Sequence, residues 1–90
     1  MTNFYGHKKY KGIYYPGDLL KFWLEEHKLS QAWLCRIMGR PEKTISEIIT
    51  GKNSVTAKTA TELEKVTDIR ADWWLQLQNN VDIKKVKGGE

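Results

Sequence analysis

The sequence has few residues of the kinds that cross-link a chain or bind metal ions. Its 90 residues include one cysteine, Cys35, and two histidines, His7 and His27. A single cysteine excludes a disulfide within the chain and a zinc site made of cysteines alone, and these three residues show none of the paired spacings of metal ligands. We therefore expect no metal or other cofactor, and a reducing compartment, the cytoplasm, as the location.

Long apolar segments and catalytic signatures are also missing. No uninterrupted apolar run exceeds four residues, whereas a membrane-spanning helix needs about 20. The first residues, MTNFYGHKKYKG, lack the apolar core of a secretory signal. There is no glycine-rich phosphate loop and no set of nucleophile, base and orienting group. We expect neither a membrane protein nor an enzyme, but one small domain around a modest core.

Positive charge is concentrated in the first part of the chain. The net charge is +4; residues 1–52 hold nine Lys or Arg against five acidic residues, and residues 53–90 hold six of each. A local positive field attracts anions, and nucleic acid is the commonest partner of that kind. Ordinary solubility charge explains the same total, so charge alone leaves both interpretations open.

The apolar pattern predicts an all-α fold of five helices. Residues 1–15 show no helical period and are expected to form a basic and aromatic arm, in which GIYY at 12–15 could pair as a short strand. Residues 16–83 are expected to form the domain and residues 84–90 a flexible tail. The first helix is expected to run to about Lys28, with Asp18 as an acid in its first turn. Its expected inner-face residues are Leu20, Leu24 and His27 or Leu29.

Caps and glycines mark the next two helices. Ser30 is expected to cap residues 31–38, QAWLCRIM, and Gly39 to end that helix. The following helix is expected to start with Pro41 at or near its first position and to end at Gly51. The expected buried residues are Leu34, Ile37 and Met38 in the first of these helices and Ile45, Ile48 and Ile49 in the second.

Two more helices are expected in the second half of the chain. Thr56 can cap the fourth helix, and the fifth follows Asp68 or Arg70 and includes ADWWLQLQNNVDI. The expected inward residues are Ala60, Leu63 and Val66 or Thr67 in the fourth helix and Trp74, Leu77 and Val81 in the fifth.

Residues 31–52 have the spacing of a helix-turn-helix motif. Small Cys35 allows the second helix to cross closely over the third, Gly39 permits a sharp turn, and Ile45 and Ile48 anchor the third helix by its inner face. The outer face of that helix is then free to lie in a major groove of DNA. The residues expected at the DNA are Gln31, Arg40, Glu42, Lys43, Ser46, Glu47, Thr50, Lys52 and Asn53.

These residues have different expected roles. Gln31, at the start of the second helix, is expected at the phosphate backbone, and Thr50 and Asn53 have the same expected role, although loop chemistry explains the last two equally well. Lys43 can pair with guanine. The other cations expected to offset phosphate charge are Arg40, Lys52 and, from the arm, Lys8, Lys9 and Lys11, which could enter a minor groove or stay solvated.

The two glutamates of the third helix need separate explanations. Glu42 lies in the first turn, where a carboxylate offsets the helix dipole without any DNA, and we favour that interpretation. Glu47 lies beyond the first turn, and we favour base reading for it, because a carboxylate can accept from cytosine N4 or adenine N6. The Glu47 carboxylate would also repel nearby phosphates and so weaken non-specific binding to DNA.

Aromatic residues at outward positions suggest contact surfaces. Phe22, Trp23 and Trp33 are expected at outward positions, where they form a contact surface. The alternative is ordinary packing under the arm or a neighbouring helix. The dimer or partner interface is expected to include Trp73, Trp74 and Leu77. A two-fold dimer through this helix would place two recognition helices about 34 Å apart and predicts a palindromic operator. The alternative is that both tryptophans belong to the core.

Three stretches resemble one known family. YPGDLL, LSQAWLCRIMGRPEKTISEIITGK and TATELEKVTDIRADWWLQLQ are similar to the Cro/C1-type (XRE) helix-turn-helix domain of the HigA antitoxins, over about residues 15–80. DWWLQLQ is the most family-specific part. The sequence departs from the family pattern at Cys35, where Ala is usual, at Arg40, where an apolar residue is commoner, and at Pro41, where a capping Ser is frequent.

The resemblance implies a function. It implies a dimeric, five-helix DNA-binding protein that represses its own operon and binds a toxin encoded beside it. The alternative is a protein-interaction module that neutralises a toxin and whose helix-turn-helix no longer binds DNA, which would agree with the glutamates and the outward aromatics.

Overall fold

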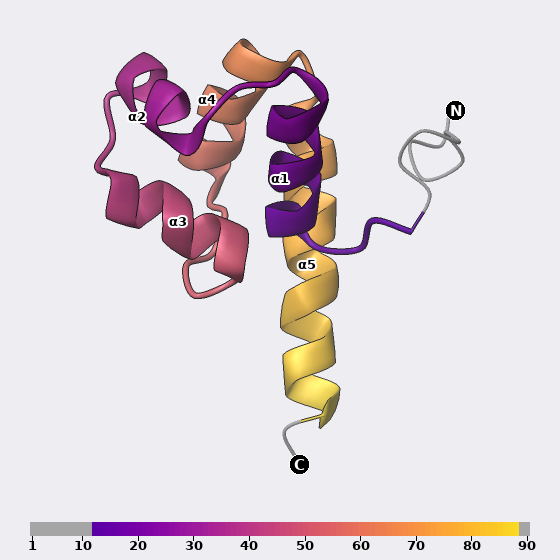
Figure 1. Cartoon of the computed structure of the whole chain (residues 1–90). Helices are drawn as coiled ribbons and strands as arrows, with labels where there is room; N and C mark the ends of the chain where they lie inside the picture. The colour runs from indigo at the N-terminus through magenta and orange to yellow at the C-terminus, as the bar shows by residue number, and fades with distance from the viewer. Residues whose placement is uncertain (1–11, 89–90) are drawn as a thin grey trace.

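The computed structural model describes residues 12–88, which form five helices arranged as a bundle with one long, projecting helix (Figure 1). The helices are α1 (Pro16–Glu26), α2 (Gln31–Met38), α3 (Glu42–Thr50), α4 (Ala57–Thr67) and α5 (Ala71–Gly88). The all-α fold of five helices is therefore confirmed. Within the described residues there is no strand, so the segment 12–15 does not pair as one. Residues 1–11 of the expected arm lie outside the described part of the chain.

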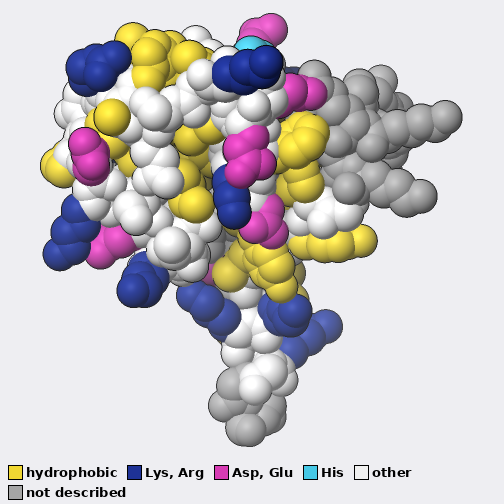
Figure 2. All heavy atoms as spheres, in the orientation of Figure 1, with side chains coloured by type: hydrophobic (Ala, Val, Ile, Leu, Met, Phe, Trp, Pro, Cys, Tyr) yellow, Lys and Arg dark blue, Asp and Glu magenta, His cyan; other side chains and the backbone are white. Residues whose placement is uncertain are grey.

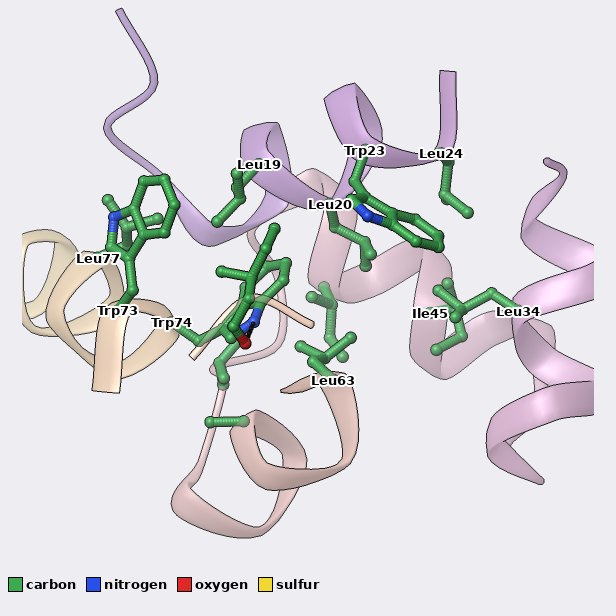
Figure 3. Packing of buried hydrophobic residues seen from close by; sticks show 14 of the residues in the cluster. Leu19, Leu20, Trp23, Leu24, Leu34, Ile45, Leu63, Trp73, Trp74 and Leu77 are labelled. Atoms are coloured by element: carbon green, nitrogen blue, oxygen red, sulfur yellow. Dashed lines mark hydrogen bonds between the residues drawn. The ribbon is translucent and has the colours of Figure 1, made fainter. Parts of the chain in front are cut away.

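One side chain or more from every helix meets in a single core. Figure 3 shows α1 and α5 side chains packed together at one end of this core and α2 and α3 side chains at the other. Burial of such side chains is the main source of stability in a domain of this size. The largest side chains with no exposed surface are Leu19, Leu20, Leu34, Ile45, Leu63, Trp74 and Leu77.

Helix α1 has Asp18 in its first turn, as predicted, and ends two residues before the predicted position. Pro16 takes the first helical position, which suits its missing N–H and fixed φ, and the helix ends at Glu26. Of the predicted inner face, Leu20 and Leu24 are buried. Of the two alternatives for the next position, Leu29 is half-buried against the core and His27 is exposed. Tyr15, in extended conformation, serves as its N-cap residue.

Trp23 belongs to the core, so the outward position predicted for it is wrong and the alternative, packing against a neighbouring helix, is confirmed. Its side chain is buried, at the i+3 position from Leu20, and its ring stacks on His27 with centroids 4.2 Å apart. Trp33 on α2 is half-buried, with its ring centroid 6.3 Å from that of Trp23. Phe22 is half-buried as well. Trp23 and Trp33 therefore pack where α1 meets α2 and do not form an open contact surface.

The caps of α2 agree with the sequence, but its buried stripe does not. Ser30 caps α2, because its Oγ accepts a hydrogen bond of 3.0 Å from the Trp33 N–H. Gly39 ends the helix in the left-handed region, at φ 67°. Leu34 and Cys35 are buried, whereas Ile37 is 55% exposed, which corrects its predicted burial. With Leu34 at the centre of the packed face, Ile37 turns to the flank of the helix.

Helix α3 begins next to Pro41, which agrees with the prediction that this proline lies at or near the first helical position. Pro41 is its N-cap residue, so Glu42 takes the first helical position. Ile45 and Ile48 are buried as expected, and Ile49 is half-buried. Gly51 ends the helix at φ 84°, again in the left-handed region.

The cap of α4 is also as predicted. The Thr56 hydroxyl accepts a hydrogen bond of 3.3 Å from the Thr59 N–H. Ala60, Leu63 and Thr67 are buried, and Val66 is half-buried. Because Thr67 points inward, its hydroxyl donates to the backbone oxygen of Leu63 at 2.7 Å.

Helix α5 corrects two predictions. Trp73, Trp74 and Leu77 are only 3, 0 and 0% exposed, so all three are core residues and the prediction that they form a partner interface is wrong. They are buried because α1 and α4 cover both sides of the start of α5 (Figures 1 and 3). The helix also continues to Gly88 where a tail was expected from residue 84, and its second half projects beyond the other helices (Figure 1).

Candidate nucleic-acid interface

Helices α2 and α3 form a helix-turn-helix unit with a three-residue turn. Gly39 takes the left-handed conformation, the Arg40 N–H donates to the Cys35 carbonyl at 3.0 Å, and Pro41 starts α3. Buried Leu34 and Ile45 meet where the two helices pack (Figure 3). This packing fixes the orientation of α3 and leaves its opposite face uncovered.

The uncovered face of α3 carries most of the predicted base-reading residues. Glu42, Lys43, Ser46 and Thr50 are exposed and follow the spacing of one helical face, whereas Glu47 is half-buried at the edge of that face. Thr50 is less free than its exposure indicates, because its hydroxyl donates to the Ser46 carbonyl at 3.0 Å. This face therefore offers both hydrogen-bond donors and hydrogen-bond acceptors to a polar ligand.

The predicted backbone-binding residues flank this face. Gln31 is exposed at the first position of α2, beside N–H groups that point out of the helix. Lys52 and Asn53 are exposed in the turn after α3, where their backbone N–H groups donate to the Glu47 carbonyl at 2.8 and 3.1 Å. These two hydrogen bonds fix the turn and leave both side chains available.

Arg40 is placed differently from the other predicted site residues. Its Nε donates to Glu62 Oε1 at 2.7 Å, and its second guanidinium nitrogen lies 2.6 Å from the same oxygen. The residue is half-buried. Its guanidinium is directed at α4 and not at solvent, so its predicted role as an open cation on the DNA side does not agree with this geometry.

Positive charge extends beyond the helix-turn-helix unit. Figure 2 shows Lys and Arg side chains along the lower edge of the molecule, from α3 to the projecting part of α5. One of the lysines of α5, Lys84, donates to the Tyr15 hydroxyl at 3.0 Å, and this hydrogen bond raises the lysine pKa above its usual value. Such an edge favours an anionic partner over a neutral one.

Cys35 has the chemistry of a packed apolar residue. Burial raises the pKa of its thiol, and the Glu42 carboxylate raises it further. A protonated thiol is a poor nucleophile and a poor metal ligand. In residues 12–88 no group of three or more His, Cys, Asp or Glu side chains could hold a metal ion. The same residues contain no helix that is long and apolar enough to cross a membrane.

Sequence reasoning missed two polar residues that organise this region. Glu62 reaches the turn of the helix-turn-helix unit, and Gln78 accepts a hydrogen bond of 2.9 Å from the Val55 N–H. Both contacts join residues more than 20 positions apart. The only sequence signal for Gln78 was that it is a polar residue directly after Leu77, in a helix whose preceding residues are mostly apolar.

Comparison with known proteins places this arrangement in a family. A helix-turn-helix family model matches residues 20–74. The chain is 33% identical over 73 residues to the uncharacterized HTH-type transcriptional regulator YbaQ of Escherichia coli K12. That match covers 80% of this chain and 65% of YbaQ, so the chain spans just under two thirds of this relative.

Two solved structures are similar over most of their length. Antitoxin HigA of Pseudomonas aeruginosa, solved with the higBA promoter, has a TM-score of 0.78 and 25% identity, with 83% of each chain covered. An addiction module antidote protein of a HigA family from Coxiella burnetii has a TM-score of 0.71 and 31% identity, with 86% of each chain covered. The chain therefore belongs to the Cro/C1-type (XRE) helix-turn-helix family, and its structural neighbours include HigA-type antitoxins.

Proposed function

We propose that this chain is a sequence-specific DNA-binding transcriptional repressor of the antitoxin type, with a regulatory and not an enzymatic role. The observation that carries the proposal is the uncovered outer face of α3, where Lys43 and Ser46 are exposed opposite the buried Ile45 and Ile48. The similar HigA of Pseudomonas aeruginosa was solved with a promoter. Helix α3 of this chain is therefore assigned to the major groove.

The contacts divide into two groups. Lys43, Ser46 and Glu47 are assigned to base edges, because they lie on or beside the exposed face of α3. The residues assigned to phosphates are Gln31, Thr50, Lys52 and Asn53. Phosphate contacts fix the register of the protein on the duplex, and base contacts select the sequence. Glu42 is assigned no DNA contact, because a carboxylate in the first turn of α3 offsets the helix dipole.

We also propose that the active form is a homodimer, and that its interface lies on the projecting part of α5. Ile83 and Val86 are 46 and 74% exposed and lie three residues apart, on one side of the helix. A solvent-exposed helix end with two large apolar side chains gains stability from a second copy. In an antiparallel pair, Asp82 of one copy can face the lysines of the other. A two-fold dimer of this kind predicts a palindromic operator.

The antitoxin part of the proposal concerns a second partner. Two similar structures are an antitoxin and an antidote protein. We assign to this chain the binding of a small toxin encoded next to it and repression of the shared promoter. Co-expression with the neighbouring reading frame tests this: the two proteins should co-purify and the growth defect of the neighbour alone should disappear. Growth inhibition that this chain does not relieve would contradict it.

The DNA-binding part is tested with the region upstream of its own reading frame. Nuclease footprinting with pure protein should protect two half-sites about one helical turn apart on one face of the duplex. Lys43→Ala should weaken protection of both half-sites, whereas Lys58→Ala, an exposed lysine of α4, should not. An unprotected region, or protection that does not depend on Lys43, would contradict the assignment of α3 to the groove.

A further inference from the structure

The turn between α2 and α3 is tied to α4 by an ion pair. Arg40 makes two contacts with one carboxylate oxygen of Glu62, at 2.7 and 2.6 Å, and the two side chains are 26 and 29% exposed. Charge-assisted contacts with two donors on one acceptor constrain geometry more than a single flexible contact does. The turn is therefore held from a third helix, outside the helix-turn-helix unit.

Helix α3 lacks the usual restraint at its start. Its N-cap residue is Pro41, and no side chain caps the first turn. The N–H groups of Thr44 and Ile45 donate to the Pro41 carbonyl at 3.1 and 3.4 Å, so the first turn depends on where that carbonyl lies. Arg40 directly precedes Pro41 in the chain. The ion pair thus supplies a tertiary restraint at the place where a capping Ser or Thr would supply a local one.

The restrained segment leads directly into the exposed face of α3. Glu42 and Lys43 follow Arg40 by two and three residues, and both are exposed. A small shift of the helix start would move these side chains relative to a groove, and recognition by hydrogen bonds tolerates displacements of only about 0.5 Å.

We propose that Arg40 and Glu62 are a positioning pair that sets the start of the recognition helix, so that Glu62 on α4 controls operator affinity without touching DNA. The proposal rests on the DNA-binding function proposed above. It also reassigns Arg40 from a phosphate contact to a residue that acts through the placement of Lys43.

The two roles of Arg40 predict opposite effects of Glu62→Gln. If the pair positions α3, this variant weakens operator binding about fivefold, leaves binding to unrelated DNA unchanged, and leaves the dependence of affinity on salt unchanged. If Glu62 only holds Arg40 away from phosphates, the variant strengthens binding to all DNA and steepens the salt dependence by about 0.9 in log–log slope for each phosphate gained.

A second ion pair provides the matched control. Arg70 and Asp72 lie at the start of α5, 2.9 Å apart, and their side chains are 64 and 62% exposed. Asp72→Asn removes one carboxylate next to an arginine, as Glu62→Gln does, and changes the net charge by the same amount. It should leave the operator affinity unchanged. A fivefold loss in both variants would mean that the effect does not depend on the turn between α2 and α3, and would overturn the proposal.

A measurement without DNA separates this proposal from the proposed function. Hydrogen exchange of the Thr44 and Ile45 amides in free protein should be faster in Glu62→Gln than in wild type, and the charge-swapped double variant Arg40→Glu with Glu62→Arg should restore the protection. Unchanged exchange in Glu62→Gln, with wild-type operator affinity, would overturn the positioning role while leaving the repressor assignment intact. Failure of the wild-type protein to prefer any operator would instead remove the repressor assignment.

Discussion

The first turn of α1 lies directly on the last turn of α3, and Gly17 is the contact that permits it. A Cβ atom on Gly17 would lie 2.6 Å from the backbone oxygen of Ile48, closer than real Cβ atoms come to such an oxygen, and the Ile49 oxygen would obstruct it as well. Backbone atoms cannot move aside as a flexible side chain can. Gly17→Ala should therefore lower the free energy of unfolding by about 2 kcal/mol, measured by urea denaturation.

Gly88→Ala is the control for this variant. Gly88 is also helical, but nothing lies within 4 Å of a Cβ at that position. Its replacement should change the free energy of unfolding by less than about 0.5 kcal/mol. Equal effects of the two substitutions would show that the contact between α1 and α3 is not close in solution.

Gln78 supports the segment between α3 and α4. Its Oε1 accepts from the Val55 N–H at 2.9 Å, and its Nε2 donates to Asp82 at 3.0 Å, in a residue that is buried. Gln78→Leu leaves the Val55 N–H without this acceptor and should cost about 2 kcal/mol of unfolding free energy. Gln76→Leu, at an exposed position two residues away, should cost less than about 0.5 kcal/mol. A stable Gln78→Leu variant would show that water replaces the amide.

Glu47 is the residue whose substitution separates base reading from surface charge. Glu47→Gln removes a negative charge near phosphates, so binding to unrelated duplexes should strengthen by roughly threefold. The preference for the operator over unrelated DNA should narrow by about tenfold, because the amide presents a donor where the carboxylate only accepts. Anisotropy titrations with both duplexes measure this.

Glu42→Gln is the comparison within the same helix. Glu42 lies in the first turn of α3, so its substitution should lower stability by about 0.5 kcal/mol and leave the operator preference unchanged. If neither glutamate alters the preference, Glu47 is ordinary surface charge.

The dimer surface is tested at the end of α5. Ile83→Glu and Val86→Glu place a carboxylate in the proposed contact between two copies, and each should convert the dimer to a monomer in sedimentation equilibrium. Ile37→Glu is the control, because Ile37 is similarly exposed but lies on α2. Dimers that survive both substitutions in α5 would place the interface elsewhere.

Local signals in the sequence predicted most of the helix boundaries. Ser30, Thr56, Gly39 and Gly51 act through hydrogen bonds or backbone angles within a few residues of themselves, so their roles are visible in a short stretch of sequence. The helix-turn-helix arrangement followed from them together with the buried isoleucines of α3.

Contacts between distant residues were not predictable in the same way. Nothing near Arg40 indicates that Glu62 faces it, and nothing near Trp73 indicates that α1 covers it. An apolar residue on a helix is consistent with a core or with an interface until the neighbouring helices are placed. For the same reason, the tryptophans of α5 were assigned to a partner, whereas both belong to the core.

The most direct test of the repressor assignment compares two DNA duplexes at one salt concentration. Fluorescence anisotropy should give a dissociation constant for the promoter duplex at least about a thousandfold lower than for a scrambled duplex of the same length and composition. Lys43→Ala should remove most of this difference in affinity between the two duplexes. Because Lys43 is exposed, the substitution should leave the fold intact. Equal affinity of the wild-type protein for both duplexes would contradict the assignment.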